Sequence, residues 1–249
     1  MAALLNFFHA FGQYTFLQNA LLAGVIIGLV SGVIGAFSIL QGTALIGDAM
    51  SHAVLPGIAI AALLGIPYYW GAGVFGLLAA LIINFIAEHT PLKTDAAIGL
   101  TFSSFFALGT IIMTAGHSTT KLTDILFGNI LAVSGGDLIS SLVIGLIVIL
   151  VVAIFYRELY LTTFDRSYAQ AQGIRANLFR NLLVVMITLV IIVALRAVGV
   201  ILVTALLITP AASARLLVKR FQPMIWLSAA FGVLSAFVGL FLSYTFDWP

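Results

Sequence analysis

Long apolar runs alternate with short polar breaks along the whole chain. A helix needs about 20 apolar residues to cross the hydrocarbon core of a bilayer. On this measure the pattern predicts eight spans, near residues 18–40, 43–64, 70–87, 96–115, 136–156, 179–195, 198–216 and 224–246. Two breaks are longer than the others, roughly 116–135 and 157–178, and neither is long enough for a soluble domain. Residues 1–249 are therefore predicted to form one transmembrane domain.

The composition decides which solvent surrounds this domain. Hydrophobic residues make up 63% of the chain and charged residues 7%, too few polar groups to cover a water-soluble fold. In lipid, every backbone N–H and C=O needs an internal partner, which leaves helix bundles or closed barrels. The runs are too long for the ten-residue alternating strands of a barrel. The fold class is all-α, a polytopic transmembrane helix bundle.

The basic residues give the bundle a direction, because Lys and Arg stay on the cytoplasmic side more readily than they cross. With the N-terminus outside, only Lys121 and Arg196 of the ten lie at outer ends. The inner ends then hold Lys93, Arg157, Arg166, Arg175, Arg180, Arg215, Lys219 and Arg220. The 157–178 segment is thus cytoplasmic, and its small-residue stretch 169–173 predicts a short surface helix that ends at Gly173.

Two ionisable side chains lie inside a span, whereas the other acids and histidines fall at span ends or in loops. Solvation explains the latter group, which comprises Glu88, His89, Asp95, His117, Asp124, Asp137, Glu158, Asp165 and Asp247. Asp48 and His52 fall within the second predicted span. At about 1.5 Å per residue, His52 lies roughly 13 Å from Thr43. An ionisable residue at membrane depth is costly and therefore a functional candidate.

The spacing of Asp48 and His52 places a carboxylate and an imidazole on one face of a helix, within reach of one cation. The chain has no cysteine, and an oxygen and nitrogen ligand set suits manganese, iron or zinc better than copper(I). Two ligands leave the site open, as release of a transported ion requires. Pro56 deprives the His52 carbonyl of its usual helical N–H donor, so we expect a kink beside the site and a carbonyl free to face the ion.

The sequence also bears on several other functions. Asp48 and His52 could form a purely structural pair, or serve an intramembrane metalloenzyme, but the spans contain no other deep acid or histidine. None of the three lysines stands in a phosphate-binding Walker loop, and neither His-Glu-x-x-His nor Gly-x-Ser-x-Gly occurs. No strongly basic face for nucleic acid is present. A channel or carrier that needs no ATPase stays an alternative.

The sequence resembles the permease subunits of bacterial manganese, zinc and iron ABC importers, and most closely the manganese permeases of Gram-positive bacteria. The resemblance extends over essentially the whole chain. Its most specific motifs are 47–57 (GDAMSHAVLPG), 97–104 (AIGLTFSS), 125–131 (ILFGNIL), 198–202 (VGVIL) and 207–212 (LITPAA).

The resemblance implies a non-catalytic subunit of a multi-pass transporter in the bacterial plasma membrane, with no permanently bound cofactor. It implies a second permease copy, two cytoplasmic ATPase subunits and an extracellular metal-binding lipoprotein. The transported ion would be Mn²⁺, or alternatively Zn²⁺ or Fe²⁺, and Asp48 and His52 would be its pathway ligands. The segment 157–178 resembles the family's coupling helix, which docks on the ATPase. The coupling residues expected from this resemblance are Asp165, Tyr168, Ala171 and Gly173.

One departure concerns the C-terminus. Members of the family usually continue with another hydrophobic segment and a basic tail, whereas this sequence stops at Trp248-Pro249. We therefore expect this chain to show eight spans of a design that has nine.

Overall fold

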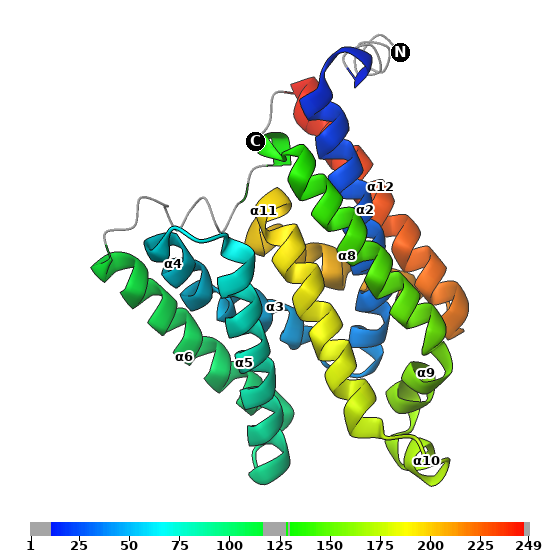
Figure 1. Ribbon diagram of the computed structural model, residues 1–249. Coiled ribbons are helices and arrows are strands. Elements are labelled where there is room, and N and C mark those ends of the chain that lie inside the picture. The colour runs from blue at the N-terminus through cyan, green and yellow to red at the C-terminus, as the bar shows by residue number, and fades with distance from the viewer. Residues whose placement is uncertain (1–10, 117–127, 129, 247–249) are drawn as a thin grey trace.

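The computed structural model describes residues 11–116, 128 and 130–246, and this part of the chain is helical with no strand. Loop positions such as His117, Lys121, Asp124 and Asp247, and most of the motif 125–131, lie outside the described residues. The elements are α2 (Thr15–Leu40), α3 (Ala44–Ala53), α4 (Leu55–Leu64), α5 (Tyr68–His89), α6 (Thr94–Ala115), η1 (Ile130–Ala132), α8 (Gly135–Ile154), α9 (Tyr156–Phe164), α10 (Arg166–Ala171), α11 (Ala176–Leu217) and α12 (Phe221–Phe246). The prediction of an all-α bundle is confirmed (Figure 1).

Seven of the described segments are long and apolar enough to cross a membrane, and Ile201–Leu217 is a shorter apolar helix. The predicted spans 179–195 and 198–216 both fall within α11, and they meet near Gly199, which has φ 73° and ψ 168°. A side chain is strained at such a φ, so glycine allows the chain to turn there. The second half of α11 leaves the first at this point and turns back into the bundle (Figure 1).

The bundle is built around α2, which packs against α8, α11 and α12. Glycines recur every fourth residue on α2 and bring the backbones close. A Cβ atom at Gly28 would lie 2.4 Å from the carbonyl oxygen of Gly232 on α12. The Ser228 hydroxyl donates a 2.7 Å hydrogen bond to the carbonyl of Gly32. This stripe of small residues is therefore a packing seam between α2 and α12.

Large apolar side chains cover the outside of α5, α6 and α8. Leu81, Ile111 and Leu146 are 64%, 63% and 64% exposed. Exposed apolar surface on this scale marks contact with lipid or with other protein rather than with water. The outer faces of these helices agree with the membrane location predicted from composition.

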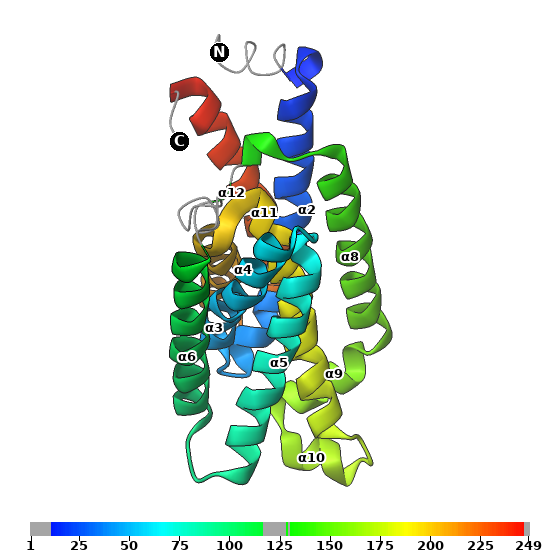
Figure 2. The ribbon, with the colours of Figure 1, turned by 60° about the vertical axis from the view of Figure 1, so that its left-hand side comes forward.

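The helix ends and the turns between helices gather at two opposite ends of the bundle. The start of α2 and the end of α12 lie together at one end (Figures 1 and 2). The turn between α5 and α6 lies at the other end, with α9 and α10. Lys93, Arg157, Arg166 and Arg175 belong to that second end, so the bias of basic residues toward the cytoplasm predicts that it is the cytoplasmic one.

Candidate metal site and cytoplasmic cleft

Helix α3 carries Asp48 and His52, and a tight turn after α2 holds its start. Gly42 has φ 68° in this turn. The hydroxyl of Ser38 donates to the Thr43 carbonyl at 3.1 Å, and the Thr43 hydroxyl donates to the Ser38 carbonyl at 3.2 Å. These reciprocal bonds satisfy polar groups that the turn would otherwise bury unpaired. The base of α3 is thus fixed to the end of α2.

Asp48 and His52 lie side by side, as their spacing predicts. The His52 Nε2 and Asp48 Oδ1 atoms are 3.8 Å apart, and the two side chains are 17% and 48% exposed. This distance is too long for a hydrogen bond. Two atoms that each lie about 2.1 Å from a shared ion can be at most about 4.2 Å apart. The separation is therefore compatible with one bridging cation as well as with a simple ion pair.

Two phenylalanines of α6 enclose the His52 ring. Its centroid lies 5.1 Å from that of Phe102 and 5.3 Å from that of Phe106, and both contacts are edge-to-face. Among the described residues, the buried Nδ1 atom of His52 has no hydrogen-bond partner. The ring is thus held by packing, with Nε2 directed to the Asp48 side.

The helix breaks directly after this pair. Helix α3 ends at Ala53 and α4 begins at Leu55, which places Pro56 in the first turn of α4. A Cβ atom at Gly109 would lie 3.0 Å from the Pro56 nitrogen, so glycine lets α6 pack on the break. The expectation of a free His52 carbonyl was wrong: an N–H at the end of α3 donates to it, because the chain tightens there and substitutes for the donor that Pro56 lacks.

One chain supplies an incomplete metal site. In the part of the chain that the structure describes, no three His, Cys, Asp or Glu side chains cluster closely enough to hold an ion. Asp48 and His52 alone provide one oxygen and one nitrogen ligand. Such a pair can hold a divalent ion in passing, but a resident ion needs further ligands.

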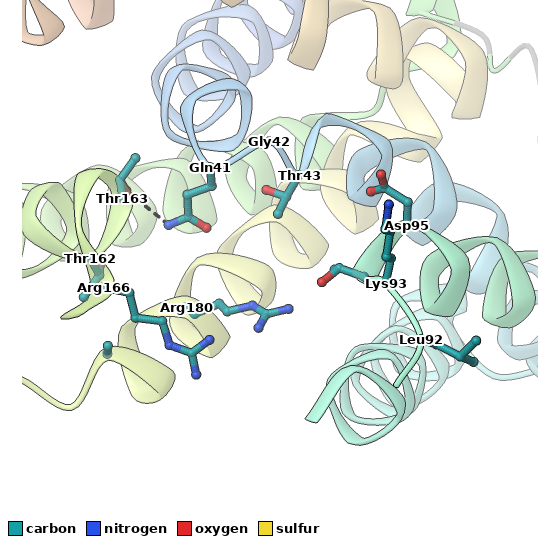
Figure 3. Close-up of a pocket in the computed structure, with 12 residues that line it drawn as sticks. Gln41, Gly42, Thr43, Leu92, Lys93, Asp95, Thr162, Thr163, Arg166 and Arg180 are labelled. Carbon is teal, nitrogen blue, oxygen red and sulfur yellow. Dashed lines mark hydrogen bonds between the residues drawn. The ribbon is translucent and has the colours of Figure 1, made fainter. Parts of the chain in front are cut away.

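A polar cleft of about 550 Å³ opens at the cytoplasmic end of α3 (Figure 3). Its walls come from the α2–α3 turn, the α5–α6 turn, α9, α10 and the start of α11. The lining side chains include Lys93, Asp95, Arg166 and Arg180. Because Thr43 also lines it, the cleft comes within five residues, or about 7.5 Å of helix, of the Asp48 level.

The predicted surface helix is α10, which begins at Arg166, three residues before the expected start. The Asp165 side chain caps it by accepting the Tyr168 N–H at 2.9 Å, as acidic N-caps do. Gly173 follows its end with φ 79°. Asp165, Tyr168, Ala171 and Gly173 are all exposed, so the side chains expected from the coupling resemblance are accessible on the cytoplasmic surface.

A long-range hydrogen bond joins the end of α9 to the end of α2, next to the turn into α3. The Gln41 side-chain amide donates to the Thr163 hydroxyl at 3.1 Å, across 122 positions in sequence (Figure 3). Gln41 ends α2 just before the turn into α3, and Thr163 lies in the last turn of α9. This hydrogen bond links the end of α9 to the turn that precedes α3.

Asp137 corrects the interpretation of all the acids at span ends as solvated. It is 8% exposed. Its carboxylate accepts a 2.6 Å hydrogen bond from the Tyr69 hydroxyl and bonds from Ser134 that complete a capping box at the start of α8. The Asp137 carboxylate can be buried because each of its oxygens accepts a hydrogen bond. This cluster joins α8 to the start of α5 at the outer end.

Comparison with known proteins identifies the family of this chain. The model of the ABC 3 transport family matches residues 13–249. The chain belongs to the ABC 3 transport family. The ABC 3 relatives include the manganese import system permease protein ScaB of Streptococcus gordonii, 48% identical over 97% of this chain and 87% of that protein. The manganese transport system membrane protein MntC of Listeria monocytogenes is 48% identical over 94% of this chain and 84% of its own length.

A solved structure shows the same fold. The structure named PsaBC from Streptococcus pneumoniae in complex with Fab superposes with a TM-score of 0.89 at 45% identity, and covers 98% of this chain and 88% of its own. The family resemblance inferred from the motifs is therefore confirmed. As an ABC 3 member with seven apolar helices among the residues that the structure describes, the chain is a multi-pass protein of the bacterial plasma membrane.

Sequence reasoning missed three features of the site. Phe102 lies within a quoted motif and Phe106 follows it at helical spacing, but the chain has 19 phenylalanines and spacing alone does not show which of them face His52. Nothing local signals the bond between Gln41 and Thr163. The Tyr69–Asp137 contact likewise depends on how α5 and α8 meet, which no motif reveals.

Proposed function

We propose that this chain is the membrane-spanning subunit of an ATP-driven importer that passes a divalent transition metal, foremost Mn²⁺, into the cytoplasm. The observation that carries the proposal is the Asp48–His52 pair beside the break between α3 and α4, at membrane depth. The names of the 48%-identical relatives support manganese. The oxygen and nitrogen ligand set also accepts Zn²⁺ and Fe²⁺, the alternatives within the same function.

The incomplete site leads to a second part of the proposal. Two ligands from one chain are too few for a specific ion site, and Asp48 is half exposed. A second copy that brings its own Asp48 and His52 to the same point would raise the ligand number to four. We infer a homodimer on this ground, with an extracellular lipoprotein that delivers the ion and two ATPase subunits that bind the cytoplasmic end.

Coupling to ATP hydrolysis follows from the contacts of α9 and α10. The exposed Asp165–Gly173 segment is the surface that the ATPase would move, and Asp165, Tyr168, Ala171 and Gly173 are the positions that would contact it. Thr163 transmits that movement to Gln41 and so to the base of α3. The polar cleft beside Thr43 gives an ion leaving Asp48 a short route to water.

The test is metal accumulation in cells that lack their own manganese importer and carry the partner subunits. Expression of the wild-type chain should raise cell manganese, measured by elemental mass spectrometry, and Asp48→Asn or His52→Ala should abolish the increase. His89→Ala is the matched control for His52→Ala, because His89 is exposed at the end of α5 and lines neither the site nor the cleft. Membrane levels of each variant are measured in parallel.

Accumulation that persists in both Asp48→Asn and His52→Ala would remove the site assignment. Accumulation that persists when the ATPase is inactivated by mutation would instead favour an autonomous carrier. Competition with excess Zn²⁺ or Fe²⁺ during uptake ranks the three metals.

A further inference from the structure

A second, apolar groove lies on the membrane-facing side of the bundle, away from Asp48 and His52. Helices α8 and α12 both pack against α2, and the space between them forms a groove of about 730 Å³. Its floor and upper walls are aliphatic, with Val33 of α2 and Ile149, Val152, Ala229 and Val233 of the flanking helices among them. Nothing in the transport proposal uses this groove.

The groove is polar at one end only. Of its lining side chains, those with N–H or O–H groups are Tyr156, Gln222 and Trp226. Tyr156 and Gln222 belong to the first turns of α9 and α12, and Trp226 belongs to the second turn of α12. The aromatic contact between Tyr156 and Phe221, with centroids 6.3 Å apart, holds these two helix starts together. Burial, and then the neighbouring Tyr160, raises the pKa of the Tyr156 hydroxyl, so it stays protonated and can donate a hydrogen bond.

Basic residues adjoin this polar end in sequence. Arg157 follows Tyr156 directly, and Lys219 and Arg220 come just before Gln222; all three are exposed. Glu158 is the acid beside them, so the local charge is positive. None of the three basic residues lines the groove itself, whose lining residues are all uncharged. In sequence they lie within three residues of Tyr156 and Gln222, whereas no charged residue lies that close to Val233 and Leu234 at the opposite end.

The length of the groove matches one leaflet. From Gln222 to Leu234 is 12 residues of α12, or about 18 Å at 1.5 Å per residue, and half of a hydrocarbon core is about 15 Å. The polar and cationic end lies at the cytoplasmic face, where anionic lipids are enriched. The groove therefore has the length and the polarity gradient of a phospholipid site, with exposed cations next to its polar end in sequence.

We propose that this groove binds an anionic phospholipid of the cytoplasmic leaflet, with its phosphate at the Tyr156–Gln222 end and an acyl chain along Ile225, Ala229 and Val233. The lipid ties α8 and α9 to α12, and so supports the junction from which the cytoplasmic segment begins.

Trp226 provides the test, because it lines the groove and is 72% exposed. The full chain with Trp70→Phe and Trp248→Phe keeps Trp226 as its one tryptophan. It is reconstituted in vesicles of phosphatidylcholine that contain brominated phosphatidylglycerol or brominated phosphatidylcholine, and bromine quenching of the fluorescence is measured against mole fraction. The matched control keeps Trp70 alone, which is also 72% exposed but lies at the outer start of α5.

The expected result is half-quenching of Trp226 at a lower mole fraction of the brominated anionic lipid than of the neutral one, with no such preference at Trp70. Each cation near an anionic headgroup changes affinity by about fivefold, so Lys219→Gln with Arg220→Gln should remove most of the preference. Arg157→Gln, on a different helix, should lower it independently. Ala230→Leu, which fills the groove beside Trp226, should reduce quenching by both lipids.

Three results would overturn the proposal. The first is equal quenching of Trp226 by the two lipids. The second is an anionic preference that survives both charge variants. The third is a Trp226 that no brominated lipid quenches, which would mean that a second copy or another protein segment covers the groove.

Discussion

Gly71 and Gly73 lie two positions apart on α5, and we expect opposite effects when each is replaced by alanine. A Cβ atom added at Gly71 would lie 2.0 Å from the carbonyl oxygen of Gly57 and 3.0 Å from the Ala61 Cβ, whereas one at Gly73 would meet no atom within 4 Å. Gly57 follows Pro56, so Gly71 controls how closely α5 approaches the helix that continues from the metal site. Gly71→Ala must therefore push α4 and α5 apart, and Gly73→Ala must not.

The magnitude follows from the difference between the two variants. Both gain the same helix propensity from Gly→Ala, about 1 kcal/mol, so this contribution cancels in the comparison. Overpacking of a tight contact costs about 1–3 kcal/mol. At about 2–4 °C per kcal/mol for a chain of this length, Gly71→Ala should unfold several degrees below Gly73→Ala.

Thermal unfolding in detergent, followed by tryptophan fluorescence, measures this difference, and manganese accumulation in cells measures its functional effect. We expect Gly71→Ala to lose accumulation because the break at Val54 shifts with α4, and Gly73→Ala to keep it. Equal unfolding temperatures for the two variants would refute the close approach of α4 and α5 at this point.

Three further predictions concern single contacts. Phe106→Ala removes one of the rings against His52, worth about 0.5–1.5 kcal/mol beyond lost area, and should lower both the unfolding temperature and manganese accumulation. Gln41→Leu and Thr163→Val should each slow ATP-driven uptake by about two- to tenfold, and the double variant should be no slower than either, measured as initial rates. Tyr69→Phe deprives a buried carboxylate of a donor, which costs about 1.5–3 kcal/mol and should appear as a lower unfolding temperature with uptake per folded molecule unchanged.

The span pattern could be predicted because it depends on a one-dimensional quantity, and the predicted orientation depends on another. Transfer of about 20 residues into lipid outweighs local propensity, and charge bias sets direction. The pair formed by Asp48 and His52 also follows from helical periodicity within one element. The positive φ of Gly199, by contrast, could not be predicted, because the sequence shows only a short gap between two predicted spans near this residue.

Contacts between helices could not be predicted, because they depend on the rotation and depth of each helix against its neighbours. Asp137 looks like any acid at a span end until Tyr69 is placed beside it. The missing Pro56 N–H predicts a free His52 carbonyl, but the chain supplies another donor by tightening the last turn of α3.

The junction between α3 and α4 has a mechanical consequence. Val54 keeps a helical backbone there, with φ −78° and ψ −15°, and its carbonyl accepts the Ile58 N–H at 3.1 Å. The two helices are therefore joined by a helical residue rather than by a loop. Because Pro56 has no N–H to donate, a bend at this point breaks fewer backbone hydrogen bonds than a bend elsewhere in a helix. The end of α3 that carries Asp48 and His52 can thus tilt while α4 stays packed against α5 and α6.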